Sequence, residues 1–273
     1  MKIGFLGAGN MGGAIIRGYA RAAAARGETP EVFVFDTDEA KTRALTELPG
    51  VRAVDDAQAL VNESETLVIA LKPNAFDTAI PMIAACAKRA EPKRDRVFVS
   101  IAAGIGIGYL SGILGRDAKI VRAMPNTPAM TGEGMTALSR GDRVTDEEYA
   151  ETLRIFESTG RVASIKETMF DAVTGISGSS PAYVFMYIQA LIECGLNNGL
   201  NDRDARLFAA QSALGAAKMA LESDESPEQL KINVCSPGGT TVEAVRVLEE
   251  RGFADAVKAA AEAAIEKSRR MTR

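Results

Sequence analysis

A glycine-rich turn near the start of the chain constrains the fold more than any other feature. Gly7, Gly9 and Gly12 form a G-x-G-x-x-G pattern between the apolar run KIGFL (residues 2–6) and a helical stretch at residues 11–26. In this strand–turn–helix context the pattern predicts a dinucleotide-binding unit. Gly7 permits the tight turn, Gly9 lets the backbone approach a pyrophosphate, and Gly12 allows close helix–strand packing, while the helix N-terminus offers N–H groups to phosphates. A glycine-rich turn without a ligand is the alternative.

Asp36 follows the second apolar run, EVFVF at residues 31–35. An acidic residue at this place usually accepts hydrogen bonds from the ribose hydroxyls of NAD and repels the 2′-phosphate of NADP. Thr37, Lys41 and Arg43 come shortly afterwards and could serve a phosphate. A simple N-cap role for Asp36 is the alternative. The sequence therefore leaves the choice between NAD and NADP open.

Short apolar runs alternate with helical stretches through the first half of the chain. We expect strands at residues 2–6, 31–35, 66–71, 96–101 and 119–124, with helices at residues 11–26 and 38–48. Short apolar strands separated by helices indicate a parallel sheet that is covered on both faces. The sequence therefore predicts an α/β fold whose N-terminal domain is a Rossmann doubly wound sheet.

Helical patterns replace strands beyond about residue 160. Asn201, Ser226 and Pro227 are favourable residues at helix starts. We therefore predict a dinucleotide-binding domain at residues 1–163 and an all-helical domain at residues 164–273. The expected helices of the second domain cover residues 179–199, 202–223, 226–234, 240–251 and 254–269.

One of these helical stretches, residues 182–200, is apolar on nearly every side. Such a helix is buried on most of its surface. A domain of about 110 residues has a limited interior in which to bury it. Burial between subunits and a central position in a monomeric bundle are the two interpretations.

The 273-residue chain has no histidine. This excludes Ser-His-Asp hydrolases, HExxH metalloproteases and dehydrogenases that need a histidine base.

Cys86, Cys194 and Cys235 form no C-x-x-C pair, so we expect no metal site, no disulfide framework and a cytoplasmic location. The formal net charge of −4 gives no sign of a nucleic-acid partner, and no stretch suggests a signal peptide or a membrane span.

Two turns rich in small and hydroxyl residues precede helices in the second half. The first, GISGSSPAY, covers residues 175–183, and the second, SPGGTT, covers residues 236–241. Each combines a flexible backbone, hydroxyl groups and a free helix N-terminus, which suits the binding of a small carboxylate. Ordinary N-cap turns without a ligand are the alternative for either turn alone.

With these turns, the chain resembles one known family, the Δ1-pyrroline-5-carboxylate reductases, which catalyse the last step of proline biosynthesis. The resemblance extends over essentially the whole chain. Gly12, Asp36 and Ser180 depart from the residues that are common in the family. The motifs are FLGAGNMG (5–12), ALKP (70–73), SIAAGI (100–105), RAMPNTPAMTGEGMTAL (122–138), TGISGSSPAYVF (174–185) and LKINVCSPGGTTVEAV (230–245), and the last three are specific in combination.

The resemblance implies reduction of the C=N bond of Δ1-pyrroline-5-carboxylate to L-proline by hydride transfer from NADPH or NADH. Together with Asp36 at the strand end, the cofactor-side residues are then Leu6, Gly7, Ala8, Gly9, Asn10, Met11, Gly12, Ala70, Leu71, Lys72, Pro73, Ala102, Ala103, Gly104 and Asn126. The substrate-side residues are Ser177, Gly178, Ser179, Asn233, Gly238, Gly239, Thr240 and Thr241.

The resemblance also assigns roles. Thr241 matches the hydroxyl that hydrogen-bonds the ring nitrogen, which makes it the expected catalytic residue, with Lys72 as the alternative acid. The helical domain is expected to form a homodimer by interleaving with its partner, and rings of dimers are known in the family.

Two other functions remain as alternatives. A β-hydroxyacid dehydrogenase needs a lysine in the helix after the second-domain glycine motif to handle the alcohol proton, and residues 175–191 contain none. A non-catalytic dinucleotide sensor would have no use for the hydroxyl-rich second turn.

Overall fold

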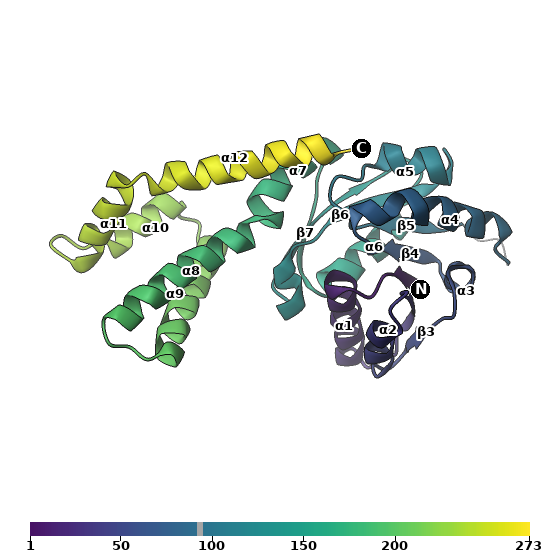
Figure 1. The fold of residues 1–273 in the computed structure, drawn as a ribbon, viewed down its shortest axis with the longest axis horizontal. Helices are drawn as coiled ribbons and strands as arrows, with labels where there is room; N and C mark the ends of the chain where they lie inside the picture. The colour runs from purple at the N-terminus through teal and green to yellow at the C-terminus, as the bar shows by residue number, and fades with distance from the viewer. Residues whose placement is uncertain (92–94) are drawn as a thin grey trace. The chain divides into compact units, whose positions relative to one another are not determined.

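The computed structural model describes residues 1–91 and 95–273, and these residues form two compact units (Figure 1). The first unit comprises Met1–Gly178 together with Ala264–Arg273, and the second comprises Ser179–Ala263. The division predicted between residues 163 and 164 falls in the last strand of the sheet. By packing, the first unit extends to Gly178 and also includes Ala264–Arg273 at the end of the chain.

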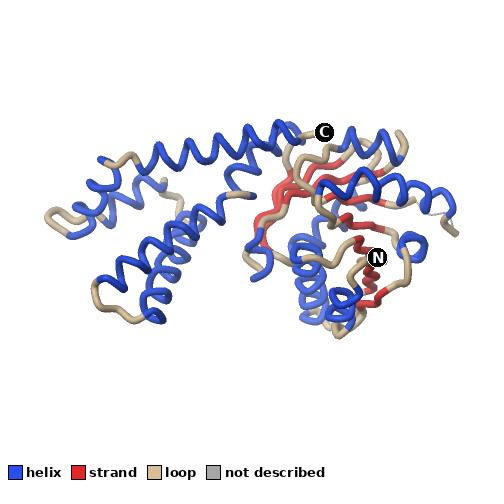
Figure 2. The backbone as a smooth tube through the Cα atoms, viewed as in Figure 1, coloured by secondary structure: helices blue, strands red, loops and turns tan. Residues whose placement is uncertain are grey.

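A sheet forms the centre of the first unit (Figure 2). Within the described residues it has eight strands in the order β3-β2-β1-β4-β5-β6-β7-β8. All neighbouring strands are parallel except β6 and β7, which are antiparallel. The strands are β1 (Lys2–Leu6), β2 (Glu31–Phe35), β3 (Val51–Ala53), β4 (Thr66–Ile69), β5 (Val97–Ser100), β6 (Lys119–Met124), β7 (Gly134–Arg140) and β8 (Gly160–Ser164).

Helices cover both faces of this sheet, as the sequence predicts. Successive strand residues point to opposite faces, so Ile3 and Phe5 of β1 join one apolar core while Leu6 joins the other. Helices α1, α2 and α6 contribute to the first core and α3, α4 and α5 to the second. Their bounds are α1 (Asn10–Ala25), α2 (Glu39–Thr46), α3 (Ala57–Glu63), α4 (Phe76–Arg89), α5 (Ile107–Leu114) and α6 (Asp146–Glu157).

Short helical segments lead out of the sheet. They are η1 (Pro73–Ala75), η2 (Thr127–Thr131), η3 (Glu167–Met169), α7 (Phe170–Val173) and η4 (Thr174–Gly178). The last of these is a π-helical turn, where the sequence indicates only a small-residue turn. π-helical turns occur frequently at functional sites.

The second unit is helical, as expected. The Asn201 side chain caps the second of its helices by accepting a hydrogen bond from the Asp204 N–H at 2.9 Å, and Ser226 caps the third with Pro227 in the first turn. Both predicted starts are confirmed to within one residue. The helices are α8 (Ser180–Asn197), α9 (Asp202–Glu222), α10 (Pro227–Val234), α11 (Thr240–Glu250) and α12 (Phe253–Met271), the last ending in the first unit.

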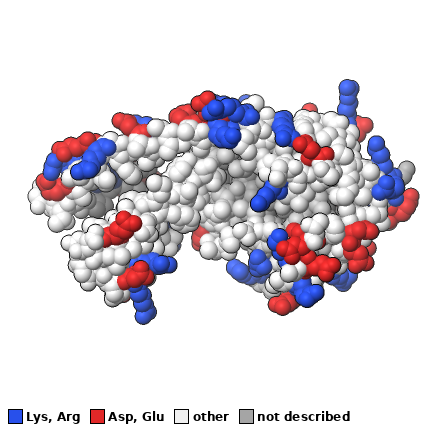
Figure 3. All heavy atoms as spheres, in the orientation of Figure 1, with Lys and Arg blue, Asp and Glu red and all other residues white. Residues whose placement is uncertain are grey.

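Helix α8 is largely exposed in the single chain, although its sequence predicts burial. Phe185 is 63% exposed and Met186 is 74% exposed. Among the described residues of this unit, the buried apolar cluster contains only Ile192, Ala205 and Ala209. The surface over α8 accordingly carries few charged side chains (Figure 3). The interpretation of α8 as the centre of a monomeric bundle is therefore wrong.

Candidate functional site

The glycine-rich turn between β1 and α1 has the geometry that a bound pyrophosphate requires. Gly7 has a φ of +106°, and a Cβ there would lie 2.6 Å from the Ala70 carbonyl oxygen. A Cβ on Gly12 would lie 2.4 Å from the Gly7 carbonyl oxygen, so this glycine allows the helix to approach the strand. A Cβ on Gly9 would meet nothing within 4 Å, which leaves the backbone open to a ligand.

The N-terminus of α1 is free to bind an anion. Gly9 is the N-cap residue and gives no side-chain cap, and the first turn contains no acidic residue. The first N–H groups of a helix have no partner within the helix and carry a partial positive charge. The turn from Gly7 to Gly12, with Ala8, Asn10 and Met11, therefore fits the phosphates of a dinucleotide.

Asp36 is fixed beside this turn by two backbone amides. Its Oδ2 accepts a hydrogen bond from the Ala8 N–H at 2.7 Å, and its Oδ1 accepts one from the Asp38 N–H at 2.9 Å. The N-cap of α2 is Asp38, not Asp36, so the simple capping alternative is wrong. The Lys41 ammonium lies 3.0 Å from the Asp38 carboxylate, and this hydrogen bond lowers the pKa of Asp38.

The other predicted cofactor residues follow the carboxyl ends of neighbouring parallel strands. The Ala70 N–H donates to the Leu6 carbonyl at 2.8 Å, which joins the end of β4 to the end of β1. Leu71 and Lys72 lead from there into η1, which begins at Pro73. Dinucleotides bind where the strand order reverses, which here is between β1 and β4.

The loop after β5 lies on the same edge of the sheet. Ala102 is buried, and its N–H donates to the Ser100 hydroxyl at 3.4 Å. Ala103 follows, and Gly104 has a φ of +73°, a left-handed conformation that glycine adopts without strain.

Asn126 joins the end of β6 to the π-helical turn. Its amide nitrogen donates to the Ser177 carbonyl at 3.3 Å and to the Ser177 hydroxyl at 3.4 Å. Its amide oxygen accepts from the Met135 N–H at 2.8 Å. The structure therefore brings together one residue predicted on the cofactor side and one predicted on the substrate side.

The π-helical turn is also packed closely against β6. A Cβ on Gly178 would lie 2.8 Å from the Met124 Cε, so a larger residue would displace that side chain. The Thr174 hydroxyl donates to the Phe170 carbonyl at 2.9 Å. Glycine at this position thus lets the turn approach the end of the strand.

The remaining substrate-side residues, Ser179, Asn233 and the turn before α11, belong to the second unit. Gly238 has a φ of +70°, and Gly239 is the N-cap of α11 without a side-chain cap, so this helix N-terminus is free. Thr240 and Thr241 are the first residues of α11. The Asn233 amide donates to Glu225 at 2.8 Å and accepts from Gln229 at 2.9 Å.

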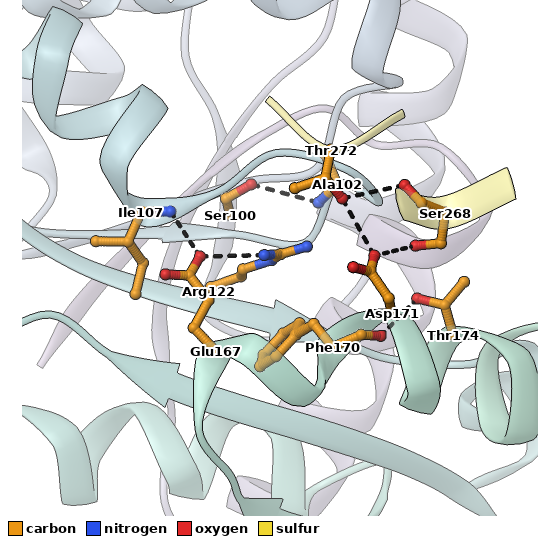
Figure 4. A network of polar contacts seen from close by, with 10 residues as sticks. All are labelled: Ser100, Ala102, Ile107, Arg122, Glu167, Phe170, Asp171, Thr174, Ser268 and Thr272. Atoms are coloured by element: carbon orange, nitrogen blue, oxygen red, sulfur yellow. Dashed lines mark hydrogen bonds and ion pairs between the residues drawn. The ribbon is translucent and has the colours of Figure 1, made fainter. Parts of the chain in front are cut away.

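Sequence reasoning missed a buried ion pair that supports the site (Figure 4). The Arg122 guanidinium lies 3.1 Å from the Glu167 carboxylate and 4.5 Å from the centre of the Phe170 ring. The same Glu167 oxygen accepts from the Ile107 N–H at 2.8 Å. An arginine between the apolar residues Val121 and Ala123 of the strand KIVRAM was the available signal, because buried charges need partners.

Within residues 1–91 and 95–273, no group of three or more Asp, Glu or Cys side chains is placed to hold a metal ion. No helix in the described part of the chain combines the length and the apolar character needed to cross a membrane.

Comparison with known proteins gives two family matches. Residues 167–271 match the family model described as pyrroline-5-carboxylate reductase dimerisation. Residues 2–104 match the one described as NADP oxidoreductase coenzyme F420-dependent.

Individual relatives are similar over the full length of the chain. The pyrroline-5-carboxylate reductase of Escherichia coli (strain K12) is 42% identical over 100% of this chain and 98% of its own length. The solved structure of Plasmodium falciparum pyrroline carboxylate reductase with NADP bound has a TM-score of 0.87 at 32% identity, covering 100% of this chain and 98% of that one. A pyrroline-5-carboxylate reductase structure from Coxiella burnetii has a TM-score of 0.88 at 31% identity, with the same coverage.

Proposed function

Because the chain belongs to the pyrroline-5-carboxylate reductase family, we propose that it reduces the C=N bond of Δ1-pyrroline-5-carboxylate to L-proline by hydride transfer from NADH or NADPH, the last step of proline biosynthesis. The full-length similarity to reductases of this name carries the proposal. The open glycine turn at the β1–β4 switch point and the two hydroxyl-rich turns supply the binding groups that the reaction requires.

The coenzyme supplies the hydride when bound. The turn from Leu6 to Gly12 would hold its pyrophosphate, because the first N–H groups of α1 have no partner within the helix and Gly9 leaves room for an approach. Residues 70–73 and 102–104 line the same strand-end edge, with Asn126 next along it. This arrangement fits a dinucleotide extended across the switch point.

The reaction makes modest demands on acid–base groups, which agrees with a chain that has no histidine. A protonated cyclic imine accepts hydride readily, so the protein mainly has to orient the ring and bind its carboxylate. Orientation alone can lower a barrier by about 7 to 11 kcal/mol at the upper limit. The Thr241 hydroxyl would hydrogen-bond the ring nitrogen, and N–H groups at a helix N-terminus would bind the carboxylate.

A direct assay tests the proposal. The protein is mixed with pyrroline-5-carboxylate and either NADH or NADPH, and the absorbance of the reduced nicotinamide is followed. We expect the absorbance to fall and proline to accumulate. A chain that folds and binds coenzyme but consumes neither one with this substrate would contradict the proposal.

We propose NADH as the preferred coenzyme. The carboxylate of Asp36 is held in place by two amides at the end of β2, where it would face the adenosine ribose. Lys41, one of the candidates for binding a phosphate, is already paired with Asp38. A 2′-phosphate would therefore meet a fixed negative charge.

The match to a dimerisation model indicates that the chain oligomerises. We propose a homodimer in which the C-terminal helices of the two subunits interleave. Large apolar side chains on α8 and α9 support this, since Met186, Phe208 and Leu214 are each more than half exposed in the single chain. Sedimentation over a range of concentrations measures the assembly, and a larger mass would indicate a ring of dimers.

We also propose a cytoplasmic location. All three cysteines, Cys86, Cys194 and Cys235, are free thiols, as is usual in a reducing compartment.

A further inference from the structure

We propose that residues 268–273, here called the docked segment, are a positioning element for the dinucleotide site. The segment comprises the last turn of α12 with Thr272 and Arg273, and it holds the loop that follows β5 and the first turn of α4, which comes directly after the loop that follows β4. This inference rests on the proposed coenzyme site, because those loops carry residues 70–73 and 102–104.

The docked segment pairs with the loop after β5 through its backbone. The Arg273 N–H donates to the Gly104 carbonyl at 2.8 Å, and the Gly106 N–H donates to the Arg273 carbonyl at 3.2 Å. A Cβ on Gly104 would lie 2.9 Å from the Met271 carbonyl oxygen, and a Cβ on Gly106 would lie 2.9 Å from that of Arg273. Only glycines allow the two backbones to approach so closely.

Asp171 fixes the segment from the other side (Figure 4). Its Oδ1 accepts hydrogen bonds from the Ser268 hydroxyl at 2.6 Å and from the Thr272 hydroxyl at 3.1 Å. Ser268 is only 6% exposed, which makes its hydrogen bond well shielded from water. Asp171 belongs to α7, the helix that leads directly into the π-helical turn bearing Ser177.

The helix that carries Asp171 is itself anchored to the sheet. Glu167 binds both the buried Arg122 of β6 and the first N–H of α5, at Ile107. The Phe170 ring lies against the same guanidinium. The docked segment is therefore bonded to α7, which Glu167 and Phe170 join to β6, and it also contacts the loop after β5.

A third contact reaches the first turn of α4, the helix that follows the loop after β4. The Arg273 guanidinium lies 2.7 and 2.9 Å from the two carboxylate oxygens of Asp77, and the Tyr109 hydroxyl donates to Asp77 at 2.7 Å. These bonds from Tyr109 and Arg273 hold the pKa of Asp77 below its usual value. Asp77 lies in the first turn of α4, just after η1.

These contacts predict an effect on coenzyme binding rather than on chemistry. A loop that is already ordered loses less conformational entropy when a ligand binds. Releasing the docked segment should therefore weaken binding of the reduced coenzyme while kcat and the KM for the imine stay close to those of the wild type. Mutations that alter the coupling between a distant contact and a binding site change the affinity by about 3- to 30-fold.

The test compares Thr272→Val, Thr272→Ser and Ser268→Ala/Thr272→Val with the wild type. Thr272 is exposed, so these substitutions at that position leave the apolar core intact. The Kd for NADH and NADPH is measured by nicotinamide fluorescence without imine, alongside kcat and both KM values. We expect the Kd to rise in the valine variants and to be restored by serine, which retains the hydroxyl. Arg270→Ala is the matched control, since Arg270 pairs only with Glu266 of its own helix among the contacts described.

Three results would overturn the inference. The first is an unchanged Kd for the coenzyme in the double variant. The second is a loss of coenzyme affinity in Arg270→Ala equal to that in the valine variants. The third is a lower unfolding temperature of the valine variants with unchanged coenzyme affinity. Because the titration contains no imine, its outcome is independent of the proposed reaction. A wild type that binds coenzyme but does not reduce the imine would refute the proposed function alone.

Discussion

Thr241 is the residue on which the proposed chemistry depends most. Thr241→Val keeps the shape and removes the hydroxyl, so the ring nitrogen would lose an oriented hydrogen-bond partner. We expect kcat/KM for the imine to fall by about 10- to 1000-fold, as for other single oriented donors. Steady-state kinetics measure this, with Thr46→Val as the control because Thr46 is an exposed threonine of α2. Near-normal turnover in a folded Thr241→Val protein would remove Thr241 from the mechanism.

At the same scale, Asp36 is the residue that we expect to set the coenzyme preference. Asp36→Ser removes the charge but keeps an acceptor near the Ala8 N–H. Because like charges in contact cost several kcal/mol, we expect the ratio of kcat/KM for NADPH to that for NADH to rise by about 10- to 100-fold. Glu39→Gln is the matched control, since Glu39 is an exposed acidic residue in the first turn of α2 and its replacement removes a neighbouring charge without breaking the pair between Asp38 and Lys41. An equal change in both variants would mean that general charge, not the position of Asp36, sets the preference.

At the scale of elements, the outward-facing residues of α9 should control assembly. Phe208 is 63% exposed, so Phe208→Glu should leave the single chain folded while placing a charge in the proposed interface. We expect the dimer dissociation constant to rise by about 30-fold or more, the effect of losing a central interface residue. Analytical ultracentrifugation measures it. Lys218→Glu is the control, because it also alters an exposed position of α9, and it should leave the measured mass unchanged. A Phe208→Glu protein that remains dimeric would show that the interface lies elsewhere.

The sequence predicts the elements with strong local signals and misses those fixed by tertiary contacts. β1, β2, β4, β5 and β6 were predicted because their apolar runs are short and bounded. β7 has the mixed sequence GMTALSR, and its antiparallel direction follows from the short η2 connection, which cannot make a parallel crossover. β3 has only three residues.

The candidate site, like the fold, was predictable only where its residues have a local sequence signature. The glycine turn has a local signature, whereas the bond between Asn126 and Ser177 joins residues 51 positions apart. Likewise, no local pattern relates Asp171 to Ser268 or Arg122 to Glu167, because each pair meets only after the sheet has formed.

On the scale of the whole molecule, the two units should respond to different variables. The first unit has two extensive apolar cores, while the buried cluster described for the second has three residues. The stability of the second unit should therefore depend on association and rise with protein concentration. Coenzyme at about 100 times its Kd should stabilise the first unit by about 2.7 kcal/mol. Scanning calorimetry over a 100-fold range of concentration checks this, and a single transition independent of concentration would contradict it.

The position of Arg273 also has a practical consequence. Its backbone oxygen accepts a hydrogen bond from Gly106, and its guanidinium is occupied by Asp77. A purification tag, fluorescent protein or immobilisation linker joined after this residue would start next to the nucleotide loops. On the proposal that the docked segment orders these loops, such a fusion would weaken coenzyme binding while leaving the fold intact. Coenzyme affinities should therefore be compared between proteins with and without a group joined after Arg273.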